Sequence, residues 1–334
     1  MRTAAIVGCG DVSVIHAEAL SALEGLELVA VVDTDAATLE AAAQRYGVPG
    51  HHSVEELIAA GAPDVIHVCT PHDQHVGVVL AALAAGIHVL MEKPVAHTME
   101  DARRIVAAAQ DSQAKIGVCL QNRYNATAQA AREIIDTGEL GRILGASASV
   151  VWTRPPGYYQ TKPWRGRWEN AGGGLLINQA IHTIDLLHWL LGGITEVSGH
   201  AATRVYGDLI EVEDTAEMTL WHGPEVRSVL YGTTGHVVNA PVTLDIIAEN
   251  GQLAIRGDLL VTSADGSTRT VRERSVATGG RSYWGASHEL LIGDFYDRLE
   301  DPEPFWLSPA EATHSLAVLK EVYAQSGFTH PGAR

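Results

Sequence analysis

The chain has 334 residues, of which 46% are hydrophobic and 19% charged, and its formal net charge is −17. This composition is typical of a globular protein and excludes a disordered one, while the length favours two domains. An excess of acidic groups repels phosphate backbones and anionic lipids. We therefore expect neither nucleic-acid nor membrane binding.

The three cysteines lie singly in apolar runs and form no CxxC pair: Cys9, Cys69 and Cys119. We expect buried thiols without disulfide bonds, which fits a reducing cytosol. The N-terminus begins with a strand-like run without a signal-peptide pattern, and no apolar stretch is long enough to span a bilayer. The predicted location is the cytoplasm.

Short apolar runs alternate with longer helical patterns over the first part of the chain. This alternation predicts right-handed βαβ units and a parallel sheet with helices on both faces, the doubly wound α/β arrangement. Strands are predicted at 4–9, 28–33, 65–69, 88–91 and 115–120, and helices at 14–23, 36–46, 54–60, 75–85 and 99–110.

The pattern changes from about residue 145 onward, where alternating apolar and polar residues predict a mainly antiparallel sheet with one open face. Asn250-Gly251 between two such runs is a strong hairpin signal. We place one domain at 1–121 and a second at 122–334, and leave open whether the C-terminal helix packs back toward the first. Strands are predicted at 145–152, 196–205, 215–221, 226–231, 243–249, 251–256 and 259–263, and helices at 175–191, 289–299 and 309–325.

A glycine-rich turn follows the first predicted strand and opens the next helix. Gly8 permits the tight turn and Gly10 lets the backbone approach a pyrophosphate, as in a dinucleotide-binding Rossmann domain. The third position of the fingerprint is Ser13 instead of glycine or alanine. We expect the intervening Asp11 and Val12 to contact the same cofactor.

Asp33 ends the second predicted strand, where a carboxylate can accept hydrogen bonds from the adenosine ribose hydroxyls. It would repel a 2′-phosphate, and the neighbouring Thr34 and Asp35 supply no cation. We therefore expect NAD, with NADP less favoured, and count Thr34 among the cofactor contacts. The alternative is that Asp33 is a solvated residue at the end of a strand.

Further motifs extend over nearly the whole chain, and together they resemble the Gfo/Idh/MocA family, the glucose–fructose oxidoreductase and inositol dehydrogenase group. The shared motifs are Gly8-Cys9-Gly10 with His16, Val68-Cys69-Thr70-Pro71 with His75, Glu92-Lys93-Pro94, and the stretch 172–189 reading GGGLLINQAIHTIDLLHW.

The resemblance implies an N-terminal Rossmann domain and a C-terminal α/β domain with a large open sheet. It also implies hydride transfer between NAD and a secondary hydroxyl or ketone of a sugar or cyclitol, by a homodimer or homotetramer associated through that sheet. It further implies that the cofactor contacts include Thr70, Pro71, His72, His75, Glu92, Lys93 and Arg123.

Three residues are the candidates for catalysis: Lys93, His182 and Asn178. The resemblance places Lys93 near the nicotinamide, where an ammonium can stabilise a developing alkoxide. Asn178, His182 and Asp185 have the spacing of one helical face, and histidine suits proton transfer near neutral pH. His182 would accept the hydroxyl proton directly or through Lys93. The alternative is a histidine hydrogen-bonded in a domain interface. Many family members carry aspartate where this chain has Asn178, which orients but adds no charge.

Substrate contacts are predicted in the aromatic and basic stretch 158–168, where Trp164 and Arg165 match a pair that lines the site of related sugar reductases. A subunit interface would be enriched in the same residue types. Arg123 and Tyr124 at the domain crossover are further candidates, although Arg123 could instead form a structural ion pair. His288, at the end of the stretch 283–288, could approach the site or cap the following helix. The complete set of predicted substrate contacts is Lys93, Arg123, Tyr124, Trp164, Arg165, Asn178 and His182.

The 16 histidines show no convincing ligand spacing, so no metal is predicted. Two other functions stay open beside a dehydrogenase. One is a glycoside-cleaving enzyme that uses NAD transiently for oxidation and elimination. The other is a non-catalytic NAD-binding regulator of the same fold.

Overall fold

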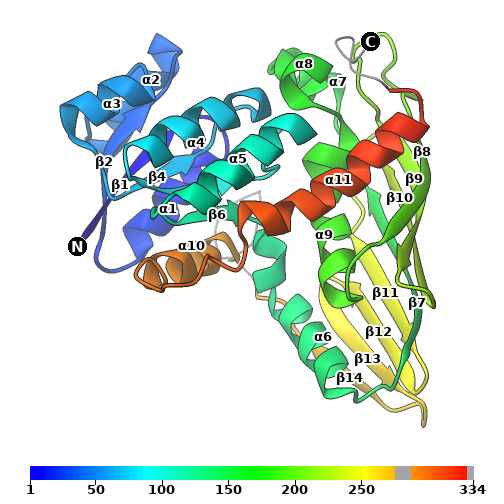
Figure 1. The fold of residues 1–334 in the computed structure, drawn as a ribbon. Helices are drawn as coiled ribbons and strands as arrows, with labels where there is room; N and C mark the ends of the chain where they lie inside the picture. Colours follow the sequence, from blue (N-terminus) through cyan, green and yellow to red (C-terminus); the bar gives the residue numbers. More distant parts are fainter. Residues whose placement is uncertain (275–286, 329–334) are drawn as a thin grey trace. The chain divides into compact units, whose positions relative to one another are not determined.

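Two compact units make up the chain in the computed structural model, which describes residues 1–274 and 287–328. The first unit comprises Met1–Gln121 and Ala286–Thr313, and the second comprises Asn122–Gly285 and His314–Arg334. Each unit is built on a sheet of its own, as Figure 1 shows. The three cysteines are free, as predicted; Cys69 and Cys119 are buried, whereas Cys9 is only partly buried.

The sheet of the first unit is parallel, with the strand order β3-β2-β1-β4-β5-β6. This confirms the predicted doubly wound α/β domain. The order reverses direction between β1 and β4, and ligands of such sheets bind at the carboxyl ends of the strands on either side of that point. The strands are β1 Arg2–Val7, β2 Leu26–Val32, β3 Gly50–His51, β4 Val65–Val68, β5 His88–Glu92 and β6 Ile116–Cys119.

Helices cover both faces of this sheet because right-handed crossovers from β1 to β2 and from β4 to β5 run in opposite directions. Helices α1 and α10 lie against each other, and so do α4 and α5. Three of the helices begin at a side-chain N-cap, namely Asp35, Ser53 and Thr98. The helices are α1 Ser13–Ala22, α2 Ala36–Tyr46, α3 Val54–Gly61, α4 His75–Ala84, α5 Met99–Asp111 and α10 Ser287–Asp297.

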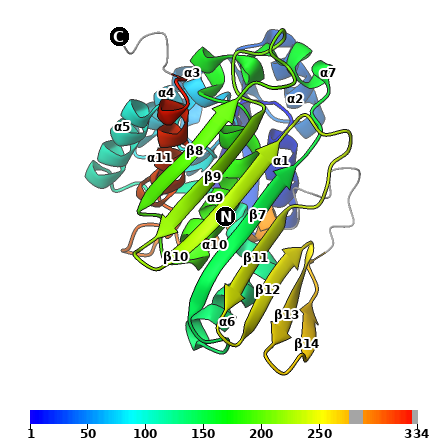
Figure 2. The same ribbon diagram turned by 90° about the vertical axis from the view of Figure 1, so that its right-hand side faces the viewer.

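The sheet of the second unit has the order β14-β13-β12-β11-β7-β10-β9-β8, which Figure 2 shows face on. All neighbours are antiparallel except β7 and β10, so the predicted mainly antiparallel sheet is confirmed. The predicted hairpin joins β11 to β12. The strands are β7 Ile143–Val151, β8 Glu196–Ala202, β9 Thr215–His222, β10 Val226–Thr233, β11 Thr243–Ala248, β12 Gly251–Arg256, β13 Asp258–Ser263 and β14 Thr268–Val271.

Helices α6 and α9 lie on one face of this sheet, and no helix in the described part of the chain covers the other face (Figure 1). Val229, Tyr231 and Ile247 are between 42% and 49% exposed. No element was predicted for α6, an alanine-rich segment with few large apolar residues. The helices are α6 Ala126–Thr137, α7 Pro156–Gln160, α8 Trp168–Ala171, α9 Ile181–Leu190 and α11 Pro309–Gln325. Over the described ranges, none of the helices has the length and apolar character of a membrane span.

Candidate active site

The turn after β1 approaches the turn after β4 so closely that only glycine fits at its first position. Gly8 has φ +91°, and a Cβ there would lie 2.7 Å from the Cys69 carbonyl carbon and from the Thr70 amide nitrogen. Gly10, Asp11 and Val12 follow in this loop, directly before α1. The backbone therefore forms an open cradle at the point where the strand order reverses, which fits the pyrophosphate of a dinucleotide.

The Asp33 carboxylate is held by backbone amides at the carboxyl end of β2. One oxygen accepts from the Cys9 N–H at 2.8 Å and the other from the Asp35 N–H at 2.9 Å. Asp33 is thus tied to the glycine loop and is more than a solvated strand-end residue. Thr34, beside it, is exposed.

The segment after β4 carries a buried hydroxyl that lacks a protein partner. Thr70 Oγ1 has no hydrogen bond to any described residue. Buried polar atoms are rarely left without partners, so this hydroxyl is consistent with a missing ligand. Pro71 and His72 follow, and His72 begins a short 3₁₀ turn, His72–Gln74.

His75 links the turn after β4 to the turn after β5. Its ring nitrogens lie 2.9 Å from the Pro94 carbonyl oxygen and 3.1 Å from the Thr70 carbonyl oxygen, and its side chain is fully buried. This buried ring therefore supports both turns, and its predicted contact with the cofactor stays a prediction. Lys93, whose peptide bond to Pro94 is cis, leaves the carboxyl end of β5 in one of the turns so supported.

A chain of hydrogen bonds that the sequence analysis missed runs through the core of this unit. The Tyr296 hydroxyl lies 2.9 Å from His67 Nε2, and His67 Nδ1 lies 2.8 Å from His16 Nδ1. His16 Nε2 and His288 Nε2 then approach the same Glu92 carboxylate oxygen, at 3.2 and 3.1 Å. His288, whose role was left open, therefore belongs to this network, while residues 283–286 of its stretch lie outside the described residues.

One set of protons satisfies every contact in the network. If Glu92 is ionised, both imidazoles beside it donate through Nε2, so His16 Nδ1 must accept from His67 Nδ1–H. His67 Nε2 then accepts from the Tyr296 hydroxyl. Burial lowers the pKa of His16 and lowers that of His67 further. Burial alone would raise the pKa of Glu92, but hydrogen bonds from His16 and His288 hold it well below its usual value.

The donor atoms of His16, Glu92 and His288 lie within 4.8 Å of one another, which is close enough to hold a metal ion. Sequence spacing could not indicate this group, because its members come from three distant segments. In the proton assignment above, His16 Nε2–H and His288 Nε2–H both donate to the Glu92 carboxylate oxygen, so each of the three atoms already has a hydrogen-bond partner. We therefore interpret the cluster as a hydrogen-bond network and keep the absence of a metal as a prediction.

Acid is expected to destabilise the fold through this network. The unfolded chain binds more protons than the folded one below about pH 6.5, because folding lowers the pKa of His16 and of His67. Each group then removes up to about 1.4 kcal/mol of stability per pH unit, and Glu92 adds to the loss below about pH 4.5. Urea unfolding at a series of pH values measures this slope. Exposed His52 is the control, since His52→Gln should leave the slope unchanged. Burial raises the pKa of Glu213 in the second unit to about 7, which offsets the slope of one of the two histidines. Stability that does not fall between about pH 6.5 and about pH 5 would contradict the assignment.

In the second unit, the helix predicted at 175–191 begins with a π-helical segment, Leu176–Ala180, and continues as α9. Asn178 lies in the π-helical part and His182 in the first turn of α9. Such segments are frequent at functional sites. They also alter the angular spacing, so the expected common face of Asn178, His182 and Asp185 does not follow from α-helical geometry.

Asp185 forms a buried ion pair with Arg123, which was the alternative stated for that arginine. Arg123 Nε and Nη2 lie 2.8 and 2.7 Å from the two carboxylate oxygens, and each residue is 1% exposed. The Ser315 hydroxyl adds a contact at 3.3 Å. Arg123 therefore anchors the helix that carries His182, and Tyr124 lies beside it in the short turn Gln121–Tyr124.

The aromatic stretch is linked to the same helix through Tyr158. The Arg165 guanidinium lies 4.1 Å from the centre of the Tyr158 ring and 5.8 Å from that of Trp164. Gln179, next to Asn178, donates to the Tyr158 hydroxyl at 3.2 Å. Tyr158 and Gln179 thus join Arg165 to the helix that carries Asn178, and the role of Arg165 stays a prediction.

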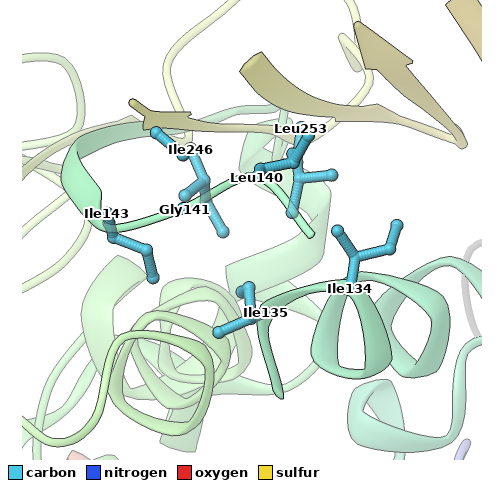
Figure 3. A pocket seen from close by; sticks show the side chains of 8 residues that line it. Ile134, Ile135, Leu140, Gly141, Ile143, Ile246 and Leu253 are labelled. Atoms are coloured by element: carbon cyan, nitrogen blue, oxygen red, sulfur yellow. The ribbon is translucent and has the colours of Figure 1, made fainter. Parts of the chain in front are cut away.

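An apolar pocket lies where α6 packs on the sheet, and Figure 3 shows its side chains. It offers no charged or hydrogen-bonding side chain that could orient a substrate. We interpret it as an imperfection in packing. Its lining residues are Ile134, Ile135, Leu140, Gly141, Ile143, Ile246, Ala248 and Leu253.

The reversed strand order, the glycine cradle and the acidic end of β2 define the first unit as an NAD-binding Rossmann domain. Residues 2–120 match the oxidoreductase family model described as an NAD-binding Rossmann fold, and residues 128–254 match the GFO/IDH/MocA C-terminal domain. The chain therefore belongs to the Gfo/Idh/MocA oxidoreductase family.

Individual relatives agree with this assignment. D-Glucoside 3-dehydrogenase of Escherichia coli is 32% identical over 97% of this chain and 95% of its own. The 1,5-anhydro-D-fructose reductase of Ensifer adhaerens is 35% identical over 50% of each chain. Among solved structures, the WlbA dehydrogenase of Bordetella pertussis in complex with NADH and UDP-GlcNAcA matches with a TM-score of 0.84 at 30% identity, covering 98% of this chain and 97% of that one.

Proposed function

We propose that this protein is an NAD-dependent dehydrogenase that acts on a secondary hydroxyl of a sugar or cyclitol, or on the corresponding ketone. The observation that carries the proposal is Lys93 at the carboxyl end of β5, the strand next to the β1–β4 reversal where the glycine cradle lies. The orphaned Thr70 hydroxyl and the anchored Asp33 carboxylate support a dinucleotide at that edge.

Bound NAD would supply or accept the hydride, and the side chains of the chain would manage the proton. The Lys93 ammonium would donate a hydrogen bond to the substrate oxygen and stabilise its developing negative charge. His182 would accept the hydroxyl proton during oxidation and return it during reduction. Asn178 would orient His182 without adding charge, because its amide cannot ionise.

Asp33 favours NAD over NADP in this proposal. Its two oxygens already accept amide hydrogens, which fixes their direction and leaves further lone pairs for ribose hydroxyls. A 2′-phosphate would bring a second negative charge against a carboxylate that cannot turn away. We therefore expect higher kcat/KM with NAD than with NADP.

The relatives suggest the substrate class, since one is a glucoside dehydrogenase and another binds a sugar nucleotide. Tyr158 and Trp164 could pack on sugar C–H faces, and Arg165 and Tyr124 could bond hydroxyl groups. The open face with Val229 and Tyr231 is where we place a homodimer or homotetramer contact. The three free cysteines fit a cytoplasmic location.

A substrate screen tests this function. Free sugars, alkyl glucosides, inositols, anhydrosugars and uronates are each incubated with NAD or NADP, and NADH absorbance is followed. The expected result is steady NADH formation with at least one polyol and a preference for NAD. Cleavage of a glucoside without net NADH would instead support the glycoside-cleaving alternative. Tight NAD binding without turnover of any compound would support a regulator.

A further inference from the structure

Glu213 is a fully buried carboxylate beneath the start of the helix that carries Asn178 and His182. One of its oxygens accepts from the Gly174 N–H at 2.8 Å, and the other accepts from the Leu176 N–H at 2.7 Å. The Tyr323 hydroxyl donates to that second oxygen at 2.7 Å. Three donors thus converge on one carboxylate at the start of the π-helical segment.

The turn that precedes the helix requires glycine at positions 173 and 174, because Glu213 and Tyr323 pack directly against its backbone. A Cβ on Gly174 would lie 1.9 Å from the Glu213 carbonyl oxygen, and one on Gly173 would lie 2.2 Å from the Tyr323 hydroxyl. Lys320 Nζ donates to the Gly172 carbonyl oxygen at 2.6 Å, so α11 holds the turn from a second side. The turn is therefore packed closely against Glu213 and Tyr323, and these bonds hold the residues from which the next segment starts.

We propose that Glu213 is a positioning residue for catalysis, which sets the placement of Asn178 and His182 by anchoring the first turn of their helix. A carboxylate can accept all three hydrogen bonds at once and also complements the positive end of the helix. The opposite anchor of the helix is the Arg123–Asp185 ion pair. This inference rests on the proposed dehydrogenase function.

The anchor is sensitive to protonation. Burial raises the pKa of Glu213 to about 7, against the hydrogen bonds from Leu176, Tyr323 and Gly174. Among the described residues, the titratable groups that interact with it are Lys320 and Tyr323 on α11 and Tyr159 on α7. Burial also lowers the pKa of Lys320, to about 8.

A protonated Glu213 turns one acceptor oxygen into a donor, which then faces a backbone N–H or the tyrosine hydroxyl. The ionised form accepts all three hydrogen bonds, whereas the protonated form must reverse the bond to Tyr323 or lose a bond from a backbone N–H. We expect this change to weaken the anchor of the helix start. We expect kcat to fall as the pH drops through about 7, because the fraction of molecules with the anchored helix falls with it.

The test is the variant Glu213→Gln. The matched control is Glu211→Gln, the same change at an exposed glutamate two residues earlier, whose carboxylate forms an ion pair with Arg167. Glutamine keeps the size of the side chain, but its amide N–H₂ replaces one of the two acceptor oxygens and then faces the backbone N–H of Gly174 or of Leu176. We expect kcat of E213Q to fall at least about tenfold, since one misplaced catalytic group costs that much or more. The KM for NAD should change less than about twofold because the cofactor elements lie in the first unit. Two protonations lower the rate on the acid side, that of Glu213 and that of the proposed base His182. The acid limb should therefore become less steep in E213Q, which keeps only the second, and stay unchanged in E211Q.

A second variant keeps the test decisive if E213Q folds poorly. Tyr323→Phe removes a single hydrogen bond from Glu213 and should lower kcat less than E213Q does, with the KM for NAD unchanged. A folded E213Q with wild-type kcat and an unchanged acid limb would overturn the inference, and so would Y323F with a kcat below that of a folded E213Q. If the wild-type protein turns over no substrate at all, it is the proposed function that fails.

Discussion

Lys93→Met is expected to lower the rate of hydride transfer by about 10²–10⁴-fold while leaving NAD binding largely intact. Methionine has a similar length and no charge, so the variant removes the ammonium that would stabilise the substrate alkoxide. The cradle at Gly8 and the Asp33 carboxylate are untouched by the change. Single-turnover absorbance measurements, with enzyme in excess over the substrate found in the screen, report the chemical step directly.

Lys115→Met provides the contrast, because Lys115 is buried in the same unit with a purely structural role. Its Nζ donates to the Glu303 carbonyl oxygen at 2.7 Å. This variant should lose stability, whereas the single-turnover rate of its folded fraction should match that of the wild type. A K93M enzyme with an undiminished rate would remove Lys93 from the mechanism and leave proton transfer to His182 alone.

Arg123→Leu is expected to destabilise the second unit by about 3–5 kcal/mol, because it leaves the Asp185 carboxylate buried without its partner. Both residues are 1% exposed and are joined by two short hydrogen bonds. Urea denaturation followed by fluorescence and circular dichroism measures the change. Arg204→Leu is the control, since its pair with Glu217 is about half exposed and should contribute less than about 1 kcal/mol.

The double variant Arg123→Leu with Asp185→Leu separates the ion pair from the packing. Replacing both buried charges by apolar groups is often neutral, so we expect it to recover most of the stability lost in R123L. Its kcat should stay low, because α9 would lose the anchor opposite Glu213. A single R123L variant as stable as the wild type would show that the buried pair does not hold the helix.

Local pattern predicted most of the elements because each is specified by residues close together in the chain. The apolar runs that became β1, β4 and β5 and the hairpin between β11 and β12 follow from periodicity and turn chemistry. The same holds for the glycine cradle, whose residues are consecutive, and for Asp33 at the end of the next strand. Helix α6 was not predicted although its two faces differ strongly in polarity. Local pattern could therefore have indicated this helix as well.

The sequence by itself therefore determined the fold class, the NAD-binding domain and the candidates Lys93 and His182, since motifs of adjacent residues carry all three. Only the tertiary structure decided which distant side chains share a proton or a charge. Glu92 meets a histidine 196 positions away, and Glu213 meets Tyr323 110 positions away. Such pairings depend on strand order and helix packing, and neither periodicity nor spacing encodes them. The hydrogen bonds of Glu213 at the start of the helix that carries His182 likewise join segments far apart in the chain.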